Sequence, residues 1–132
     1  MTEYRVGLGF DIHQFMRGRE LWLGGVQIPH EEGLDGHSDA DVLLHALCDA
    51  LLGAAGLGDI GQHFPPNDPQ WRNVRSSRFV EQVMKLIGEK GWSVVNIDLV
   101  VIAEVPKIGP HAAAMKNIIA SLLHIANDAV GI

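Results

Sequence analysis

The sequence predicts an α+β fold in which a mixed β-sheet is packed on one face by helices. Strand-like segments lie near the start of the chain and around residues 92–103, and amphipathic helical patterns separate and follow them. The chain has 132 residues, of which 47% are hydrophobic and 20% charged, a balance typical of a protein with a packed core. We therefore expect one domain over residues 1–132.

The first half of the chain predicts two strand regions followed by a helix. Residues 3–13 alternate between apolar and other side chains, which favours a strand, and residues 21–23 and 26–28 indicate a second strand or hairpin interrupted by glycines. A polar connector covers residues 29–38. It leads directly to the start of a helix.

We expect this helix to begin at Ser38, whose hydroxyl can accept a hydrogen bond from a backbone N–H of the first turn. Asp39 and Asp41 would then lie near the positive end of the helix dipole. A wide face of leucines follows, and Gly56 and Gly58 indicate the end of the helix.

The second half predicts a loop, two helices and a strand. Residues 58–69 contain many glycines and prolines, which favours an ordered or lid-like loop. Apolar spacing predicts a helix over residues 76–90, and β-branched residues predict a strand over 92–103. Pro110 suits the first turn of a last helix that runs to about residue 126.

Composition limits the classes of function. The formal net charge of −6 argues against broad electrostatic binding to nucleic acid or to an anionic membrane. The single cysteine, Cys48, cannot form an internal disulfide, and its leucine-rich surroundings favour a packing role over metal ligation. No apolar run approaches the roughly 20 residues of a membrane span. We expect a cytoplasmic bacterial protein, or a plastid protein whose transit peptide has been removed.

Asp11 and His13 lie two residues apart in the first predicted strand, so their side chains project from the same face. Such a pair offers two metal ligands, and His45, about two turns into the first helix, is a candidate third. The alternative is that His45 is a hydrogen-bonded core histidine. Asp41 and Asp49, four residues before and after it, are either partners for its other ring nitrogen or solvated.

Other polar residues occur where substrates often bind. His37 and Ser38 stand at the junction of connector and helix, where a phosphate could bind, although a surface histidine and a helix cap are the simpler explanation of the two residues alone. Asp59, between glycines, suits either sugar hydroxyls or an ordinary turn. Gly7 and Gly9 lack the third glycine of a dinucleotide-binding motif, which we therefore reject.

Taken together, these segments resemble the 2-C-methyl-D-erythritol 2,4-cyclodiphosphate synthases, zinc enzymes of the non-mevalonate isoprenoid pathway. The matching motifs occur in order over nearly the whole chain: Gly9-Phe10-Asp11-Ile12-His13, Leu23-Gly24-Gly25-Val26, His37-Ser38-Asp39-Ala40-Asp41-Val42, His45-Ala46-Leu47, Leu52-Gly53-Ala54-Ala55, Gly58-Asp59-Ile60-Gly61, Phe64-Pro65, Pro106-Lys107 and Pro110-His111.

The resemblance implies a phosphorus-oxygen lyase. Its reaction converts 4-diphosphocytidyl-2-C-methyl-D-erythritol 2-phosphate to the 2,4-cyclodiphosphate and releases CMP. It also implies a homotrimer with active sites between subunits, Zn²⁺ held by the protein, and Mg²⁺ or Mn²⁺ bridging the substrate diphosphate. The resemblance further implies that the protein binds a small cytidine diphosphate substrate and that it binds neither nucleic acid nor membrane.

Site residues follow from the same resemblance. Asp11, His13 and His45 would be the zinc ligands, with the first two also near substrate, and His37 the catalytic group beside Ser38 on the substrate phosphate. The remaining substrate-binding residues fall into a sugar-contacting segment, a mobile loop and a cytosine pocket: Asp59, Ile60 and Gly61; Phe64, Pro65, Pro66, Asn67 and Asp68; and Ala103, Glu104, Val105, Pro106, Lys107, Ile108 and Gly109.

The sequence departs from the family pattern at two places. Pro66 stands where the family usually has an acidic residue. The family also continues past the last helix with a strand that carries a Thr-Thr-x-Glu segment and basic residues, so we expect this sequence to be an incomplete record of a longer chain. Two other functions stay open: a non-catalytic scaffold that binds zinc and cytidine nucleotides, and a metal-dependent phosphohydrolase.

Overall fold

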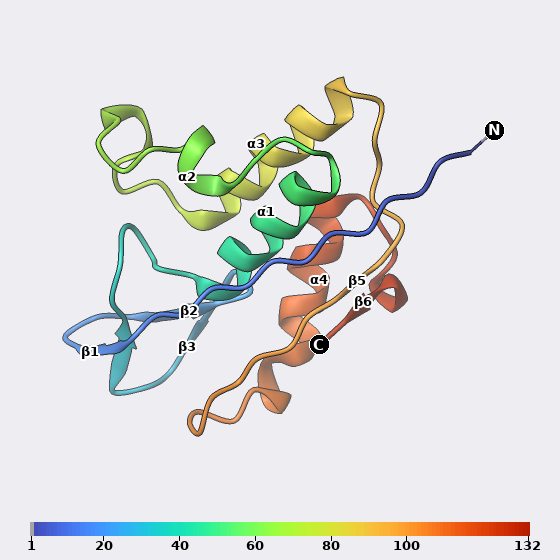
Figure 1. Ribbon diagram of the computed structural model, residues 1–132. Coiled ribbons are helices and arrows are strands. Elements are labelled where there is room, and N and C mark those ends of the chain that lie inside the picture. Colours follow the sequence, from blue (N-terminus) through green and yellow to red (C-terminus); the bar gives the residue numbers. More distant parts are fainter. Residues whose placement is uncertain (1) are drawn as a thin grey trace.

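The computed structural model describes residues 2–132 and confirms the α+β class (Figure 1). The predicted hairpin is present, because β2 (Leu21–Leu23) pairs with β3 (Val26–Ile28) in antiparallel register. Two further pairs are β1 (Phe15–Arg17) with β4 (Glu32–Leu34), which is antiparallel, and β5 (Ile97–Asp98) with β6 (Val130–Gly131), which is parallel. The strands of the described residues therefore form three two-stranded sheets of mixed direction.

Three helices of more than ten residues build the body of the protein: α1 (Val42–Ala54), α3 (Ser76–Glu89) and α4 (Ala112–Leu123). Helix α1 packs on α3, and α3 packs on α4. Shorter turns are α2 (Ile60–His63) and the 3₁₀ segments Pro69–Trp71, Gly109–His111 and Asn127–Ala129. Within residues 2–132, every helix is too short or too polar to cross a membrane.

The core lies between these helices and the β2–β3 hairpin. Its fully buried members are large aliphatic side chains, and they include Leu21, Ile28, Leu44, Leu47, Leu52, Val80, Val83, Met115, Ile119 and Leu123. Cys48 is fully buried among them, which confirms the packing role predicted for it, and burial raises the pKa of its thiol. The second predicted helix is confirmed to within one residue of its end.

The predicted strand over residues 3–13 is wrong in one respect. The segment is extended, but no part of it pairs with another strand among residues 2–132, because it lies across α1 and not beside a strand (Figure 1). A Cβ built on Gly7 would lie 1.9 Å from the Ala50 carbonyl oxygen, and one on Gly9 would lie 1.8 Å from that of Ala46. Only glycine permits so close an approach to the helix backbone.

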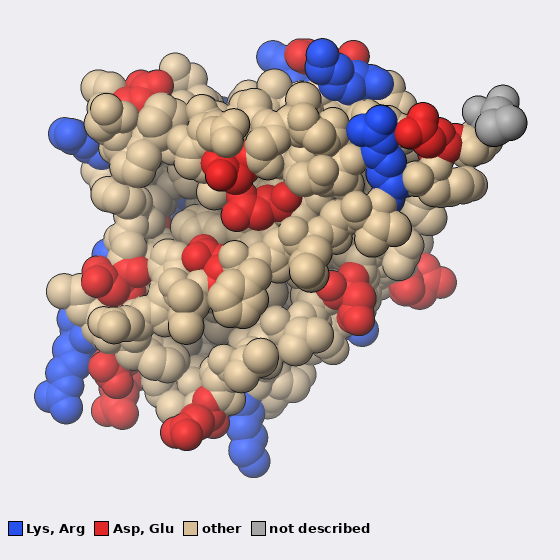
Figure 2. All heavy atoms as spheres, viewed as in Figure 1, with Lys and Arg blue, Asp and Glu red and all other residues tan. Residues whose placement is uncertain are grey.

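The predicted strand over residues 92–103 is also largely unpaired, with only β5 in a ladder. A groove of about 1440 Å³ separates this segment from the N-terminal one. In Figure 2 a hollow lies between the two segments. The Lys and Arg side chains visible on this face lie near the edge of the molecule and not at the hollow. Large apolar side chains of both segments are exposed: Tyr4, Val6, Leu8, Phe10, Ile12, Val95, Val100 and Ile102.

The predicted start of the first helix is corrected from Ser38 to Asp41, which is the N-cap of α1. Ser38 and Ala40 have φ angles of 55° and 51°, so the chain is still turning where the helix was expected. Asp41 is fully buried. Its Oδ1 accepts hydrogen bonds from the N–H groups of Leu44 and Gly24 at 3.1 and 3.0 Å.

The last predicted helix is shorter than expected. Pro110 lies in a 3₁₀ turn, α4 begins at Ala112, and His124 ends the helix in a left-handed conformation with φ of 58°. The predicted loop over residues 58–69 is ordered and contains the single turn of α2. These differences leave the order of helices unchanged.

Candidate metal centre

Asp11, His13 and His45 come together although His45 is on α1 and the other two are on the N-terminal segment. Asp11 Oδ2 lies 3.0 Å from His13 Nε2 and 3.4 Å from His45 Nδ1. Ligand atoms held at zinc bonding distances in a tetrahedron lie about 3.4 Å from one another. One ligand atom of each residue lies within 4.8 Å of the other two, a spacing that fits a single ion.

Hydrogen bonds to the other atoms of the same side chains turn these three atoms toward one another. Asp11 Oδ1 accepts from the backbone N–H of Ile12 at 2.9 Å. His13 Nδ1 lies 2.7 Å from the carbonyl oxygen of Asp35, which can only accept, so Nδ1 donates there and Nε2 is the ring nitrogen that faces Asp11. A ring nitrogen 3.0 Å from a carboxylate oxygen needs a cation between the two, either a proton or a metal ion, and two imidazoles with one carboxylate are a donor set that fits a metal ion.

His45 is held from the opposite side, and its Nε2 lies 2.8 Å from Ser76 Oγ at the start of α3. The His45 and His13 side chains are each 14% exposed, and Asp11 is 29% exposed. Burial lowers the pKa of His45, while the charge of Asp11 opposes this shift. Neutral imidazole is the form that binds a metal, so burial prepares His45 as a ligand.

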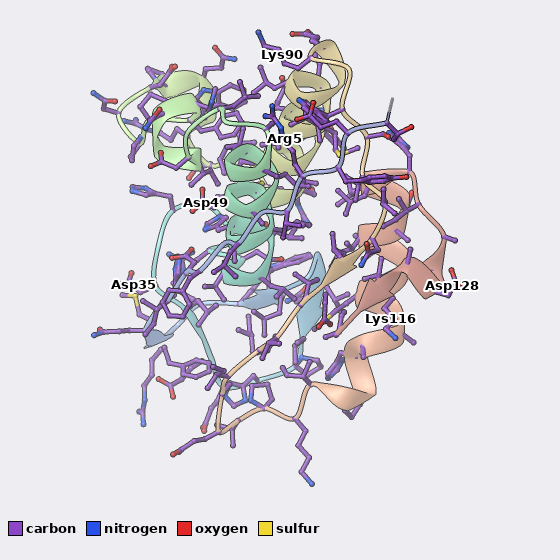
Figure 3. All side chains as sticks on the ribbon, turned by 45° about the vertical axis from the view of Figure 1, so that its right-hand side comes forward. Arg5, Asp35, Asp49, Lys90, Lys116 and Asp128 are labelled. Atoms are coloured by element: carbon purple, nitrogen blue, oxygen red, sulfur yellow. The ribbon has the colours of Figure 1, made fainter. Side chains whose placement is uncertain are left out.

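The partner of His45 is not one of the residues suggested by helical spacing. Asp41 instead binds backbone N–H groups, and Asp49 Oδ1 accepts from the N–H of Ile60 at 2.8 Å. Figure 3 shows Asp49 on the side of α1 toward the α2 segment. Neither carboxylate is solvated as the alternative expectation had it, because Asp41 is buried and Asp49 is half-buried and bonded.

Arg19 was not singled out from the sequence, yet it holds the loop that carries His37. Its guanidinium donates to the carbonyl oxygens of Gly36 at 2.6 Å and Ser38 at 2.5 Å. His37 is therefore the residue between two fixed carbonyls, and its side chain is exposed. An arginine in a glycine-containing loop before the hairpin gave no sequence signal for this contact.

The segment from Asp59 to Asp68 follows α1 and is anchored by its aromatic residue. Asp59 is exposed and caps α2, with Oδ1 accepting from Gln62 N–H at 3.0 Å. Phe64 is buried, stacking on Phe79 and meeting Trp71 edge-on, each at a ring-centroid distance of 4.8 Å. The sugar-contacting and loop roles predicted here stay predictions.

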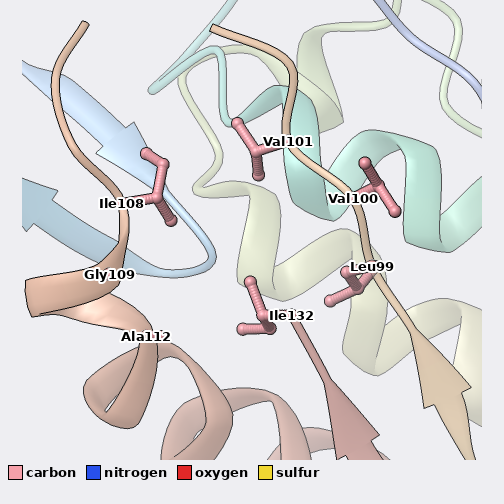
Figure 4. A pocket seen from close by; sticks show the side chains of 7 residues that line it. All are labelled: Leu99, Val100, Val101, Ile108, Gly109, Ala112 and Ile132. Carbon is pink, nitrogen blue, oxygen red and sulfur yellow. The ribbon is translucent and has the colours of Figure 1, made fainter.

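The predicted cytosine pocket, residues 103–109, lies in a mostly exposed loop before α4. Two of its members, Ile108 and Gly109, line a hollow of about 240 Å³. Figure 4 shows the seven residues around it: Leu99, Val100, Val101, Ile108, Gly109, Ala112 and Ile132. The nucleotide role of this loop is likewise untested.

The fold and the site define an α+β protein with a candidate metal centre made of two histidines and one carboxylate, two of these ligands from an extended segment and one from a helix. Residues 4–132 match the sequence profile of the YgbB family, and the chain belongs to that family.

Relatives of the chain have consistent names. A 2-C-methyl-D-erythritol 2,4-cyclodiphosphate synthase from Synechococcus elongatus is 54% identical over 132 residues, which cover 100% of this chain and 82% of that protein. A bifunctional enzyme IspD/IspF from Erythrobacter litoralis is 58% identical over 128 residues, covering 97% of this chain and 33% of that enzyme. The chain thus spans about a third of the bifunctional relative.

A solved structure of 2C-methyl-D-erythritol-2,4-cyclodiphosphate synthase in a CDP-bound form has a TM-score of 0.92 and 42% identity, covering 96% of this chain and 85% of that chain. The family predicted from the motifs is therefore confirmed, and the relatives' names place it among the cyclodiphosphate synthases, which are lyases.

Proposed function

We propose that this chain carries out the reaction of its relatives. In this reaction 4-diphosphocytidyl-2-C-methyl-D-erythritol 2-phosphate becomes 2-C-methyl-D-erythritol 2,4-cyclodiphosphate and CMP. The observation that carries the proposal is the cluster of three ligand atoms on Asp11, His13 and His45, in a chain of this family. An oxygen of the 2-phosphate forms a bond to the β-phosphorus, the bond from that phosphorus to the bridging oxygen breaks, and CMP leaves. No water is consumed.

The residues present fit Zn²⁺, which would act as a Lewis acid and orient the substrate phosphate groups, with Mg²⁺ or Mn²⁺ on the diphosphate. The chain's own part is to hold the reacting groups together and balance their charge. Arg19 fixes the two carbonyls on either side of His37, and the exposed imidazole would donate to a phosphate oxygen. Ser38 would bind the same phosphate.

Substrate contacts away from the metal complete the proposal. The start of α2, with Asp59, Ile60 and Gly61, would bind the sugar hydroxyls, and residues 64–68 would close over them. The loop of residues 103–109 would bind cytosine, in a homotrimer whose site draws on two subunits. Exposed apolar side chains along residues 4–12 support such an assembly, because surfaces of this kind usually mark interfaces.

The experiment is a measurement of CMP release from the cytidyl substrate by the full-length protein with zinc and magnesium. We expect CMP in equal amount to the cyclic product, without inorganic phosphate. Two variants test the ligand assignment: Asp11→Ala and His45→Ala should each lose both stoichiometric zinc and CMP release. Binding of CMP without turnover would favour the non-catalytic scaffold, and release of inorganic phosphate would favour a phosphohydrolase.

A further inference from the structure

Ser76 occupies a position that the metal ligands alone do not explain. It is the first residue of α3 and is fully buried, and its hydroxyl lies between the imidazole of His45 and the carboxylate of Asp39. These three side chains come from α1, α3 and the loop between β4 and α1. They form a continuous hydrogen-bonded chain that begins at a ligand.

The direction of the hydrogen bonds in this chain follows from the number of protons. A serine hydroxyl has one proton to donate, and a carboxylate can only accept. The Ser76 Oγ proton therefore goes to Asp39 Oδ1, and the Ser76 oxygen accepts from His45 Nε2–H at 2.8 Å. A neutral imidazole carries one ring proton, so His45 Nδ1 is unprotonated. Nδ1 is the atom that lies 3.4 Å from Asp11 Oδ2.

Asp39 is itself held in place by backbone groups. Its Oδ2 accepts from the N–H of Ser76 at 3.0 Å, and its Oδ1 accepts from the N–H of Asp41 at 3.1 Å. The carboxylate therefore cannot turn away from the hydroxyl without losing both. Because this acceptor is fixed, the Ser76 hydroxyl proton is donated to Asp39 and not to His45.

The two histidines differ in how their tautomers are set. His13 donates to a backbone carbonyl, that of Asp35, which no side-chain substitution removes. The partner of His45 Nε2 is instead a side chain, the Ser76 hydroxyl. Without the hydroxyl, the proton of His45 could move to Nδ1 and be donated to Asp11, which would place a hydrogen bond where a metal should bind.

We propose that Ser76, oriented by Asp39, is a positioning residue that selects the Nε2–H tautomer of His45 and so presents Nδ1 as a metal ligand. The proposal rests on the metal-dependent function proposed above. Partners of this kind typically change metal affinity 10–100-fold, which sets the expected effect at about that size.

The first test is the zinc dissociation constant, measured by competition with a chelator. Ser76→Ala should weaken zinc binding by about 10–100-fold, and Ser76→Thr, which keeps the hydroxyl, should restore it to within a few-fold. The matched control is Ser77→Ala, one residue further along α3 and about 100° around the helix, which should bind zinc like the wild type. Wild-type affinity in Ser76→Ala would overturn the proposal.

The second test is the ¹⁵N spectrum of the His45 ring in the metal-free protein, which distinguishes the two tautomers and needs no activity. We expect the Nε2–H tautomer in the wild type and a shift toward Nδ1–H in Ser76→Ala. An Nδ1–H tautomer in the wild type would overturn the proposal even if the variant failed to fold. Failure of the wild type to bind zinc would instead contradict the proposed function, and the spectrum would still decide the tautomer.

Discussion

Asp41→Ala should lower the free energy of unfolding by about 3 kcal/mol or more. The Asp41 carboxylate accepts from the N–H groups of Gly24, Gly25 and Leu44 at 3.0, 2.8 and 3.1 Å, and it is fully buried. Alanine would leave buried donors without acceptors, at about 1–3 kcal/mol each. Urea denaturation at pH 7.5 measures the loss.

The control for this substitution is Asp128→Ala, which removes an exposed carboxylate from a 3₁₀ turn and should change stability by less than about 0.5 kcal/mol. A loss below about 1 kcal/mol for Asp41→Ala would contradict the view that this one side chain joins the hairpin turn to the start of α1.

Asp41 also gives stability a defined pH dependence. Burial raises its pKa from 3.8 to about 6, against the opposing effect of the backbone donors. The folded state then binds the proton more tightly, so the contribution is full below pH 4 and is lost as pH rises through 6, by about 3 kcal/mol in all. The advantage of the wild type over Asp41→Asn should therefore be larger at pH 4.5 than at pH 7, and an equal advantage at both would contradict the shift.

Gly9→Ala should cost about a hundredfold or more in zinc affinity and about 1–3 kcal/mol in stability. Its Cβ would lie 1.8 Å from the Ala46 carbonyl oxygen and 2.8 Å from Ala50 N, both backbone atoms of α1 that cannot turn aside. The N-terminal segment must therefore lift from the helix. Asp11 and His13, two and four residues further on, would move away from His45.

Chelator competition and urea denaturation check this prediction together. Gly53→Ala is the matched control, because an added Cβ at that position of α1 would meet no atom within 4 Å apart from the adjoining backbone of its own helix, and alanine favours a helix over glycine by up to about 1 kcal/mol. Gly53→Ala should bind zinc normally and be slightly more stable. Normal zinc binding by Gly9→Ala would show that the close contact does not hold the ligands in place.

The features predicted well from the sequence are those set by neighbours along the chain. The helix from Ser76 was predicted because Phe79, Val80, Val83 and Ile87 repeat at helical spacing, and all four are buried. The placement of Asp11 and His13 on one face follows from the alternation of side chains along an extended backbone. It does not require that the segment pair with another strand.

The features that could not be predicted depend on distant contacts. Ser76 is 31 residues from His45, and nothing in its local sequence distinguishes it from an ordinary helix start. Asp41 replaced Ser38 as the helix cap because its carboxylate also meets the hairpin turn, 16 and 17 residues earlier, which local capping preference does not register. Arg19 was missed for the same reason.

The way the N-terminal segment lies on the protein links metal content to local unfolding. Residues 3–13 form no strand ladder among residues 2–132, and they contact the backbone of α1 at Gly7 and Gly9. Few backbone hydrogen bonds therefore oppose their release from the helix. An ion shared by Asp11, His13 and His45 would bind only the docked form, and docking would then be stabilised in proportion to the logarithm of free metal concentration. Hydrogen exchange in this segment would therefore report metal occupancy.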